Sequence, residues 1–293
     1  MLAIERRNAI LARLSMEGKV VVSDLSREFK VTEETIRRDL EKLDNDGLAK
    51  KTYGGAVKVE NFNTDLPFHI RKQSNVESKQ KIAEIIASMI KDGDYIMLDA
   101  STTALNVVKA IMHRKKITII TNSIEILLEL ANKPDWTVIS TGGTLKEGGL
   151  SLVGYQAEKM VEGFHVDLAV CSCKGIDVNS GVTDSNERDS QIKKAFFGSA
   201  TRKVLAVDSS KFDKVSFVKV CGLNEVDYVV TETDPGEAWK KRLNELNTNV
   251  IFQRQNQTGK NPFCTPASGR KFHPNRLFPE IPSPQRWGLA NPY

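Results

Sequence analysis

Between residues 95 and 252 the sequence repeats one pattern, in which a short apolar run ends in a polar residue and a helical stretch usually follows. The runs are YIMLD (95–99), ITIIT (117–121), TVIST (137–141), DLAVCS (167–172), KVLAVD (203–208), DYVVT (227–231) and a final NVIF (249–252). Short strands that alternate with helices favour a parallel sheet with helices on both faces. The pattern therefore predicts a mainly parallel, Rossmann-like doubly wound α/β domain.

Polar residues collect where these strands end, and doubly wound sheets bind ligands outside the carboxyl ends of their strands. Ser101, Thr102 and Thr103 stand between a strand end and a helix start, where hydroxyls and helix amides suit a phosphate. Simple capping of the helix by Thr102 or Thr103 explains the same residues equally well.

Two further loops are expected at the same edge. Thr121, Asn122 and Ser123 again precede a helix, while Gly142 and Gly143 either let the backbone approach a ligand closely or only form a turn. Three such loops at one edge favour a ligand site over coincidence.

Charged and polar residues follow the later strands. They are Lys174 and Asp177, then Asp184, Asn186, Glu187 and Asp189, and finally Asp208 and Lys211. A lysine attracts a phosphate and an unpaired acid repels it, so Asp99 and Asp177 suit sugar hydroxyls or the orientation of the loops. Surface exposure is the competing explanation for the lysines.

The segment VTEETIRRDLEKL (31–43) predicts a short amphipathic helix. Thr32 is a suitable N-cap, and Ile36, Leu40 and Leu43 recur on one face. Arg37 and Arg38 stay off that face. Taken alone, the segment is more typical of a solvated surface helix than of a DNA-binding one.

The neighbouring segments change this interpretation. ERRNAILARLSMEG (5–18) predicts a helix that ends at Gly18, and SDLSREFKV (23–31) predicts a second helix capped by Ser23. GLAKKTYGGAV (47–57) predicts two strands around a Gly-Gly turn, flanked by Lys50, Lys51 and Tyr53. Three helices followed by such a wing form a winged helix-turn-helix, whose third helix enters the major groove.

Thr35, Arg37 and Arg38 lie early on the third helix and are best placed for base-edge or phosphate contacts. Arg37 has an alternative, because Glu41 at i+4 or Glu34 at i−3 is a possible partner within the helix. The predicted DNA contacts are Ser23, Thr32, Glu34, Thr35, Arg37, Arg38, Lys42, Lys50, Lys51, Tyr53 and Gly54.

With its TIRRDL and YGGA motifs, the chain resembles the DeoR family of bacterial transcription regulators, closely over residues 1 to about 60 and then through a second domain to about 252. The resemblance implies a C-terminal domain with the fold of ribose-5-phosphate isomerase. It also implies repression of a sugar or polyol operon and release from DNA by a phosphorylated sugar.

The family's phosphate loop, usually Asp-Ser-Gly-Thr-Thr, matches Asp99 to Thr103, with Ala100-Ser101 in place of Ser-Gly. Ser101 must therefore take the backbone position of the family's glycine. Lys174 stands where many members carry an acid, which favours an anionic effector or alters the selectivity of the site. The predicted effector contacts are Asp99, Ser101, Thr102, Thr103, Thr121, Asn122, Ser123, Gly142, Gly143, Lys174, Asp177, Asp184, Asn186, Glu187 and Lys211.

Two other functions compete with a regulator. An isomerase-like enzyme that carries a DNA-binding head would turn over a sugar phosphate, although the sequence offers no convincing general base. A protein-interaction module that uses the winged head would show no salt-dependent DNA binding.

The chain divides into a winged helix-turn-helix domain (1–59), a linker (60–75), an α/β effector domain (76–252) and a proline-rich tail (253–293) predicted to be disordered. The tail holds six Lys or Arg and one Glu, which accounts for the whole net charge of +5. Residues 1–252 then carry 36 basic and 36 acidic groups, so DNA binding depends on where the charges point.

Other features limit the remaining classes of protein. No apolar run is long enough for a membrane span, and the charged N-terminus argues against export. The four cysteines form no CxxC pair and the four histidines show no ligand spacing, so we expect reduced thiols, a cytoplasmic protein, and no metal or other cofactor. We also expect a homo-oligomer, a dimer or a tetramer, on double-stranded operator DNA.

Overall fold

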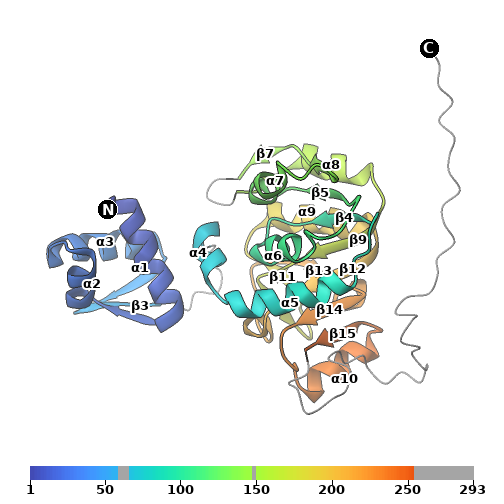
Figure 1. The fold of residues 1–293 in the computed structure, drawn as a ribbon. Helices are drawn as coiled ribbons and strands as arrows, with labels where there is room; N and C mark the ends of the chain where they lie inside the picture. Colours follow the sequence, from blue (N-terminus) through green and yellow to red (C-terminus); the bar gives the residue numbers. More distant parts are fainter. Residues whose placement is uncertain (59–65, 147–149, 254–293) are drawn as a thin grey trace, which may run out of the picture.

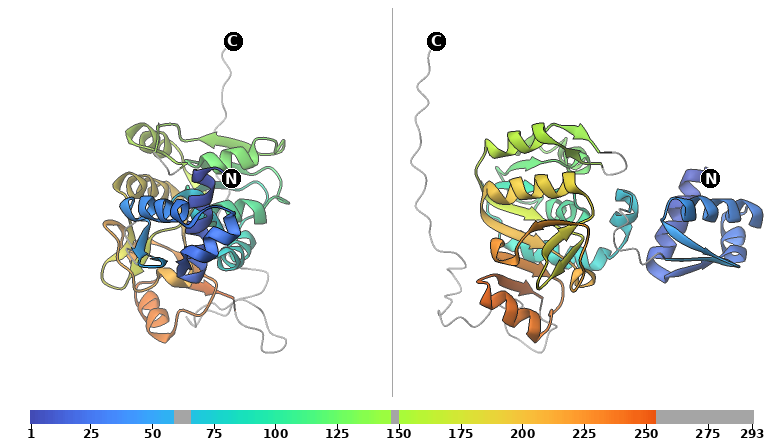
Figure 2. Two further views of the ribbon diagram at one scale, coloured as in Figure 1. Left: turned by 90° about the vertical axis from the view of Figure 1, so that its left-hand side faces the viewer. Right: turned by 180° about the vertical axis from the view of Figure 1, so that it is seen from behind.

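The computed structural model describes residues 1–58, 66–146 and 150–253, apart from the side chains of residues 15 and 16. Two units lie side by side in Figures 1 and 2, with one short helix between them. Cys264 and the predicted disordered tail, except for its first residue, lie outside the described residues.

The N-terminal unit, which we call the head, contains three helices and a small sheet. Its elements are α1 (Ala3–Glu17), β1 (Lys19–Val21), α2 (Val22–Phe29), α3 (Glu33–Asn45), β2 (Ala49–Thr52) and β3 (Gly55–Lys58). The strands pair antiparallel in the order β1-β3-β2. The three predicted helices and the wing are present, and Gly18 ends α1 in a left-handed conformation.

Three details of the head differ from the sequence prediction. Strand β1 was not predicted, because its pairing with the distant β3 leaves no local signal. Val21 rather than Ser23 stands at the N-cap of α2, so Ser23 lies inside the first turn. The wing turns at Tyr53 and Gly54, while Gly55 belongs to β3, where an added Cβ would lie 1.9 Å from the Val20 carbonyl oxygen.

A buried ion pair joins α1 to α3 beneath this sheet. Asp39 lies among the apolar residues of α3, and its carboxylate is 2.5 Å from Arg6 Nε and 3.4 Å from Arg7 Nη1. The Arg6 and Asp39 side chains are only 8% and 5% exposed. The orientation of α3 on the head is therefore set by an ion pair as well as by Ile36, Leu40 and Leu43, all of which are buried as predicted.

The C-terminal unit is a doubly wound sheet of seven parallel strands. These are β4 (Tyr95–Leu98), β5 (Thr118–Thr121), β6 (Thr137–Ser140), β9 (Val166–Cys171), β12 (Ala200–Ala206), β14 (Tyr228–Thr231) and β15 (Asn249–Phe252). They lie in the order β15-β14-β12-β9-β4-β5-β6. The chain starts at β4, extends the sheet in one direction to β6 and then resumes at β9, so the strand order reverses between β4 and β9.

Helices cover both faces of this sheet. Apolar side chains of α5 (Val76–Ser88), α6 (Thr102–Ala110) and α7 (Ile124–Leu130) join one buried cluster. Those of α8 (Tyr155–Glu162), α9 (Glu187–Gly198) and α10 (Glu237–Glu245) join the other. Strand residues alternate between the clusters as a pleated sheet requires: Ile96 and Leu98 face the first and Met97 the second.

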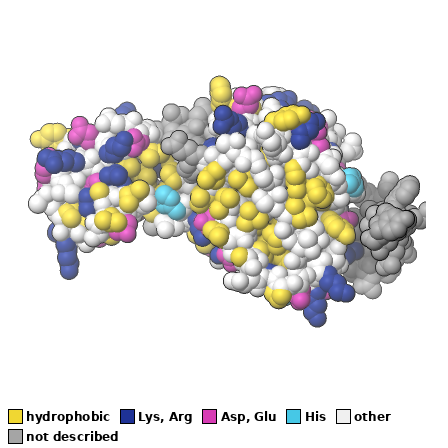
Figure 3. Space-filling model, turned by 90° about the horizontal axis from the view of Figure 1, so that it is seen from above, with side chains coloured by type: hydrophobic (Ala, Val, Ile, Leu, Met, Phe, Trp, Pro, Cys, Tyr) yellow, Lys and Arg dark blue, Asp and Glu magenta, His cyan; other side chains and the backbone are white. Residues whose placement is uncertain are grey.

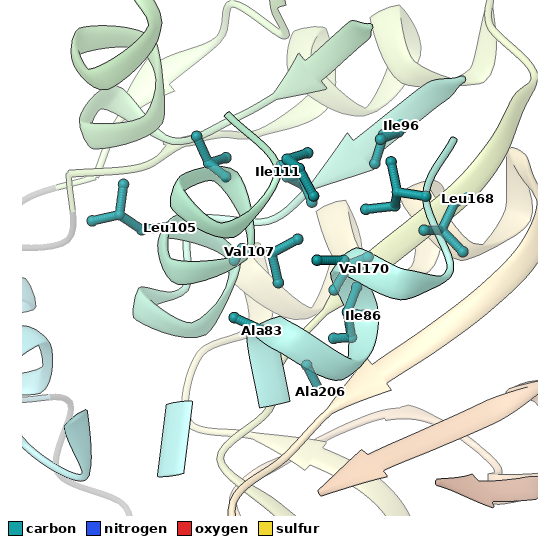
Figure 4. Close-up of a cluster of buried hydrophobic side chains, with 14 of the residues drawn as sticks. Ala83, Ile86, Ile96, Leu105, Val107, Ile111, Leu168, Val170 and Ala206 are labelled. Atoms are coloured by element: carbon teal, nitrogen blue, oxygen red, sulfur yellow. The ribbon is translucent and has the colours of Figure 1, made fainter. Parts of the chain in front are cut away.

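Figure 4 shows part of the first cluster, with helix residues packed against strand residues. The labelled residues are Ala83 and Ile86 of α5, Leu105, Val107 and Ile111 of α6 and the turn after it, and Ile96, Leu168, Val170 and Ala206 of the sheet. The fold class predicted from the apolar runs is thus confirmed by the parallel sheet and by its two covered faces.

Two small antiparallel units flank the sheet, and neither was predicted. Strands β7 (Thr144–Leu145) and β8 (Leu152–Val153) form a hairpin. A second sheet joins β10 (Gly175–Asp177), β11 (Gly181–Asp184) and β13 (Val218–Cys221). They carry the loops that follow β6 and β9 over the carboxyl edge of the main sheet.

The predicted linker, residues 60–75, holds a helix that sequence periodicity did not reveal. Helix α4 (Phe68–Gln73) buries Phe68 in the cluster of the sensor-side helices and Ile70 in the core of the head. In Figure 1 this helix stands between the two units. The rest of the predicted linker, including Phe62, lies largely outside the described residues.

Cys171, Cys173 and Cys221 are buried as free thiols. None of the helices in the described part of the chain combines the length and the hydropathy that a membrane crossing requires. Among residues 1–58, 66–146 and 150–253 no group of three or more His, Cys, Asp or Glu side chains is arranged to hold a metal ion.

The buried ion pair of the head leads to a stability prediction. We expect Asp39→Ala to destabilise the head by about 3–5 kcal/mol, because Arg6 would keep a buried charge without its partner. Thermal unfolding followed by circular dichroism would then show the head melting before the sheet domain. Glu41→Ala, on the same helix with a 61% exposed side chain, is the control and should change stability by less than about 0.5 kcal/mol. Equal melting of the two variants would contradict the prediction.

Candidate functional site

The exposed face of α3 carries the two arginines predicted to meet DNA. Thr32 caps the helix by accepting from the Thr35 amide, and Arg37 and Arg38 lie exposed one turn further along. Arg37 Nη2 lies 2.6 Å from Glu33 Oε2, and Arg38 Nε lies 3.3 Å from Glu34 Oε1. Arg37 thus pairs with Glu33, four residues before it, rather than with Glu34 or Glu41.

Arg38 is the more available of the two, since its side chain is 78% exposed against 48% for Arg37. Exposed i,i+4 ion pairs contribute only about 0.3–0.5 kcal/mol, so a phosphate or a base edge can replace the glutamate at little cost. The face therefore offers arginines that are oriented but weakly held.

The other predicted DNA contacts lie around this face. Thr35 Oγ1 lies 2.9 Å from Thr32 Oγ1, Lys42 pairs with Asp46, and Lys51 Nζ lies 3.7 Å from Glu41. The remaining residues are exposed, at the wing or in the first turn of α2: Lys50, Tyr53, Gly54 and Ser23.

A polar pocket lies at the carboxyl ends of the strands, next to the point where the strand order reverses. Asp99 directly follows β4, and its carboxylate accepts the amides of Ser101 (3.2 Å) and of Ser172 after β9 (3.0 Å). The pocket is a small cavity of about 50 Å³ that is partly open to solvent. It is lined by Arg71, Asp99, Ala100, Ser101, Asn122, Lys146, Ser151, Asp184, Asp189, Ile192 and Lys193.

Lys193 of α9 is the buried cation of this pocket. Its ammonium contacts the carboxylate of Asp184 and lies 3.5 Å from Asp99 Oδ2. Burial opposes the charge on Lys193, but the carboxylates of Asp184 and Asp99 outweigh it and raise its pKa. Burial also raises the pKa of Asp99. Lys193 therefore stays protonated and fixes the two acids relative to each other.

A second ion pair lies on the other side of the pocket. Lys146, which follows β7, lies 2.5 Å from Asp189 of α9, and Ser151 Oγ lies 3.4 Å from the same carboxylate. The lining thus contains three carboxylates and three cations, of which Arg71 has no ion pair with any carboxylate of the described residues.

Asn122, which lines the pocket, has an unused hydrogen-bond acceptor. The residue is 1% exposed, and its Nδ2 donates to the Leu152 carbonyl at 3.0 Å. Its Oδ1 has no hydrogen-bond partner among the residues that the structure describes. A buried carbonyl oxygen without a donor is unfavourable, so a ligand hydroxyl at this position would complete the site.

The family's phosphate loop adopts an ordinary backbone at Ser101, which takes the position of the usual glycine. Its φ and ψ are −93° and 153°, in the extended region open to any residue. Ser101 also caps α6 by accepting from the Ala104 amide at 3.0 Å, whereas the alternative explanation of this loop placed the cap at Thr102 or Thr103. Thr102 and Thr103 lie in the first turn of α6, directly after Ser101, which lines the pocket.

Four of the predicted effector residues line the pocket: Asp99, Ser101, Asn122 and Asp184. The other predicted residues of the second and third loops serve the fold. Thr121 Oγ1 donates to the Leu98 carbonyl, Ser123 caps α7, and a Cβ on Gly143 would lie 2.8 Å from the Val153 carbonyl oxygen. The Gly142-Gly143 pair therefore makes a tight turn against α8.

The later predicted residues also lie outside the lining. Asp177 binds the amides of Asn179 and Ser180 in the β10–β11 turn, and Asn186 caps α9. Glu187 is exposed in the first turn of α9, while Lys174 and Lys211 follow β9 and β12. These residues share the sheet edge but do not reach this pocket.

Sequence reasoning missed Arg71, Lys146, Ser151 and Lys193 as lining residues, and named Asp189 only among the acids that follow the later strands. Asp189 and Lys193 stand four residues apart on α9, a spacing that places both on one helix face and was visible in the sequence. Arg71 gave no such signal, because it lies in the segment predicted as a linker.

A winged helix-turn-helix head joined to a sheet domain with a polar pocket at its switch point defines a DNA-binding transcriptional regulator with a ligand-sensing domain. The DeoR-like helix-turn-helix domain model matches residues 6–62, and the DeoR C terminal sensor domain model matches residues 74–233. The chain therefore belongs to the DeoR family of transcriptional regulators.

Several curated proteins are similar to this chain over most of its length. An uncharacterized HTH-type transcriptional regulator of Bacillus subtilis is 40% identical over 250 residues, covering 85% of this chain and 96% of that protein. The L-fucose operon activator of Haemophilus influenzae is 32% identical over 227 residues, covering 78% and 91%. The glycerol-3-phosphate regulon repressor of Escherichia coli is 28% identical over 231 residues, covering 79% and 91%.

Among solved structures, ribose 5-phosphate isomerase A from Methanocaldococcus jannaschii superposes on 47% of this chain and 55% of its own, with a TM-score of 0.36 and 18% sequence identity.

The orphan acceptor of Asn122 leads to a binding prediction. We expect Asn122→Ala to weaken binding of a hydroxylated phosphate by about 1–2 kcal/mol, the contribution of one hydrogen bond in a buried site. The change in binding free energy is measured by calorimetry. The ligand is the sugar or polyol phosphate that the wild type binds most tightly in a panel. Asn106→Ala is the control, because Asn106 donates to its own helix at Thr102 O and does not line the pocket. Equal affinities in the two variants would remove Asn122 from the site.

Proposed function

We propose that the chain represses a carbohydrate or polyol catabolic operon and is released from its operator by a phosphorylated sugar. The observation that carries the proposal is the pocket at the switch point, which combines cations, a helix N-terminus and an unused carbonyl acceptor. The relatives named above act on fucose and glycerol-3-phosphate genes, one as an activator and one as a repressor. Repression rather than activation is therefore part of the proposal.

The groups of the pocket suit the two halves of a sugar phosphate. The amides of Thr102 and Thr103 and the guanidinium of Arg71 favour an anionic group. Asn122 Oδ1 accepts from a hydroxyl, and the carboxylates of Asp184 and Asp189 are further acceptors at the pocket wall. We propose these residues as the effector contacts, and keep Thr121, Ser123, Lys174, Asp177 and Lys211 as surrounding residues of the same edge.

We propose that the protein regulates without turning over its ligand. A general base must present an available acceptor to the substrate proton. Asp99 instead accepts two backbone amides and lies next to Lys193, while Asp184 contacts the same lysine. Asp189 is paired with Lys146. Each carboxylate of the pocket is thus paired with a lysine, which disfavours its protonation but leaves lone pairs that can accept from a ligand hydroxyl. This supports binding over proton transfer and argues against the isomerase-like alternative.

We propose that the regulator acts as a homo-oligomer. Leu128 of α7, Leu145 of β7 and Tyr155 of α8 are large apolar side chains with more than half of their surface exposed. Figure 3 shows hydrophobic side chains gathered on this face of the larger unit. Large apolar side chains exposed on one face commonly mark a protein interface. Two heads on operator half-sites would also compensate for the weak nonspecific binding of a near-neutral domain.

The experiment that tests the function is operator binding to DNA from the chain's own upstream region, with and without a panel of sugar phosphates. We expect specific binding that weakens as salt rises, and that one phosphorylated sugar abolishes. Retention of the operator with every phosphate in the panel would reject effector release. Consumption of any panel member during the titration would favour the enzyme.

A second prediction concerns the recognition helix. We expect Arg38→Ala to cost about 1–3 kcal/mol of specific operator binding per head and to leave the sensor domain folded, because Arg38 is the more exposed arginine of α3. Lys81→Ala removes a cation from a similar i,i+4 pair on α5 and serves as the control. Fluorescence anisotropy at two salt concentrations measures both. If the Arg38→Ala variant binds the operator as tightly as the wild type does, the assignment of α3 as the recognition helix is wrong.

A further inference from the structure

Helix α4 has neighbouring residues in two different cores. Phe68 is 2% exposed in the cluster formed by α5, α6 and the sheet. Ile70, two residues later, is fully buried in the cluster of the head together with residues of α1, α2 and α3. Because protein cores are close-packed, a displacement of α4 must be accommodated on both sides.

Arg71 brings the same helix to the ligand pocket. Its side chain lines the pocket together with Ser101, Asn122 and Lys146. Its Nε donates to the Leu66 carbonyl at 3.0 Å, and its guanidinium lies 5.4 Å from the centre of the Phe68 ring. The guanidinium is therefore held by its Nε and by the face that stacks on the Phe68 ring, and these contacts do not use its two Nη groups. Arg71 forms no ion pair within the described residues, unlike Lys146 and Lys193.

The end of α4 is fastened to the sensor domain. The ammonium of Lys79 contacts the carbonyl oxygens of Arg71 and Ser74, and Lys72 Nζ lies 3.1 Å from Glu125 on α7. Lys79 is 6% exposed, and burial lowers its pKa to about 8. The short helix is therefore held at its carboxyl end while its middle packs against the head.

We infer that Arg71 binds the anionic group of the effector, and that α4 transmits this contact to the head through Ile70. The inference rests on the proposed function and adds a ligand contact supplied by the segment between the two domains. A guanidinium with free N–H groups is well suited to a phosphate, since it can donate two parallel hydrogen bonds. An effector changes the head only if it binds one arrangement of α4 better than another.

The test uses the full chain with inorganic phosphate as the probe. Calorimetry at constant ionic strength gives the phosphate dissociation constant for wild type, Arg71→Gln and Lys72→Gln. Hydrogen exchange with and without saturating phosphate reports on three segments: the loop at residues 99–104, α4, and α1. Lys72→Gln is the matched control, because Lys72 is the next residue of α4 and pairs outside the pocket.

We expect Arg71→Gln to weaken phosphate binding at least tenfold, with less than a twofold change in Lys72→Gln. In the wild type, phosphate should slow exchange in the loop, in α4 and in α1. In Ile70→Ala, phosphate should bind with unchanged affinity and protect the loop and α4, but no longer α1. Where Ile70→Ala leaves the head unfolded, Ile70→Val gives the same comparison with a smaller cavity.

Wild-type phosphate affinity in Arg71→Gln would overturn the anion contact, and protection of the loop without α4 would overturn the transmission. Both outcomes leave the pocket itself intact. Absence of any phosphate effect in the wild type, together with no response to the sugar-phosphate panel, would reject the effector site and the inference with it.

Discussion

Lys193 joins its own helix α9 to the end of β11 just before it and to the loop after β4, which lies far away in the sequence. It extends from α9 to Asp99 after β4 and to Asp184 at the end of β11. Removing such charges from water costs several kcal/mol per ion, which only good mutual geometry repays. Asp99 also accepts the Ser172 amide after β9, so the same carboxylate ties β4 to β9 where the strand order reverses. The other pocket groups, the first turn of α6 and the Lys146–Asp189 pair, are positioned around this buried network.

In the head, by contrast, the charged residues that face solvent are held only by weak, exposed ion pairs. Its recognition helix keeps a buried acid, Asp39, paired with Arg6, and leaves Arg37 and Arg38 in exposed pairs with Glu33 and Glu34. The buried pair sets the angle of the helix and is costly to disrupt, while the exposed pairs are cheap to exchange. The glutamates also reduce the attraction of the arginines for arbitrary DNA. We therefore expect such a head to bind DNA tightly only at sites where a base edge or a phosphate can replace Glu33 and Glu34 as the partners of the arginines.

The parallel sheet and its helices were predictable because each strand is a local apolar run and each helix has its own periodicity. Ile36, Leu40 and Leu43 show this for α3, whose N-cap was also read correctly at Thr32. Elements without a local signal were missed: β1 is defined by a distant partner, and α4 is too short to show a period. In the pocket, strand-end residues such as Asp99 and Asn122 were found. The partners that arrive from α9, β7 and α4 were not, since only tertiary folding brings Lys193, Lys146 and Arg71 to that edge.

Helix α4 lies between the two ranges that the family models match, residues 6–62 and 74–233, so sequence comparison treats the two domains as separable modules. The packing of Ile70 says otherwise, since the head's core is completed by a residue from beyond its own match. During evolution, heads can be exchanged between relatives by recombination in the interval that neither family model matches. The new head would then pack against a residue 70 that evolved with the old head. Because Phe68 of the same helix is buried in the other core, a crossover on either side of α4 separates one of its two buried residues from the core that it packs against.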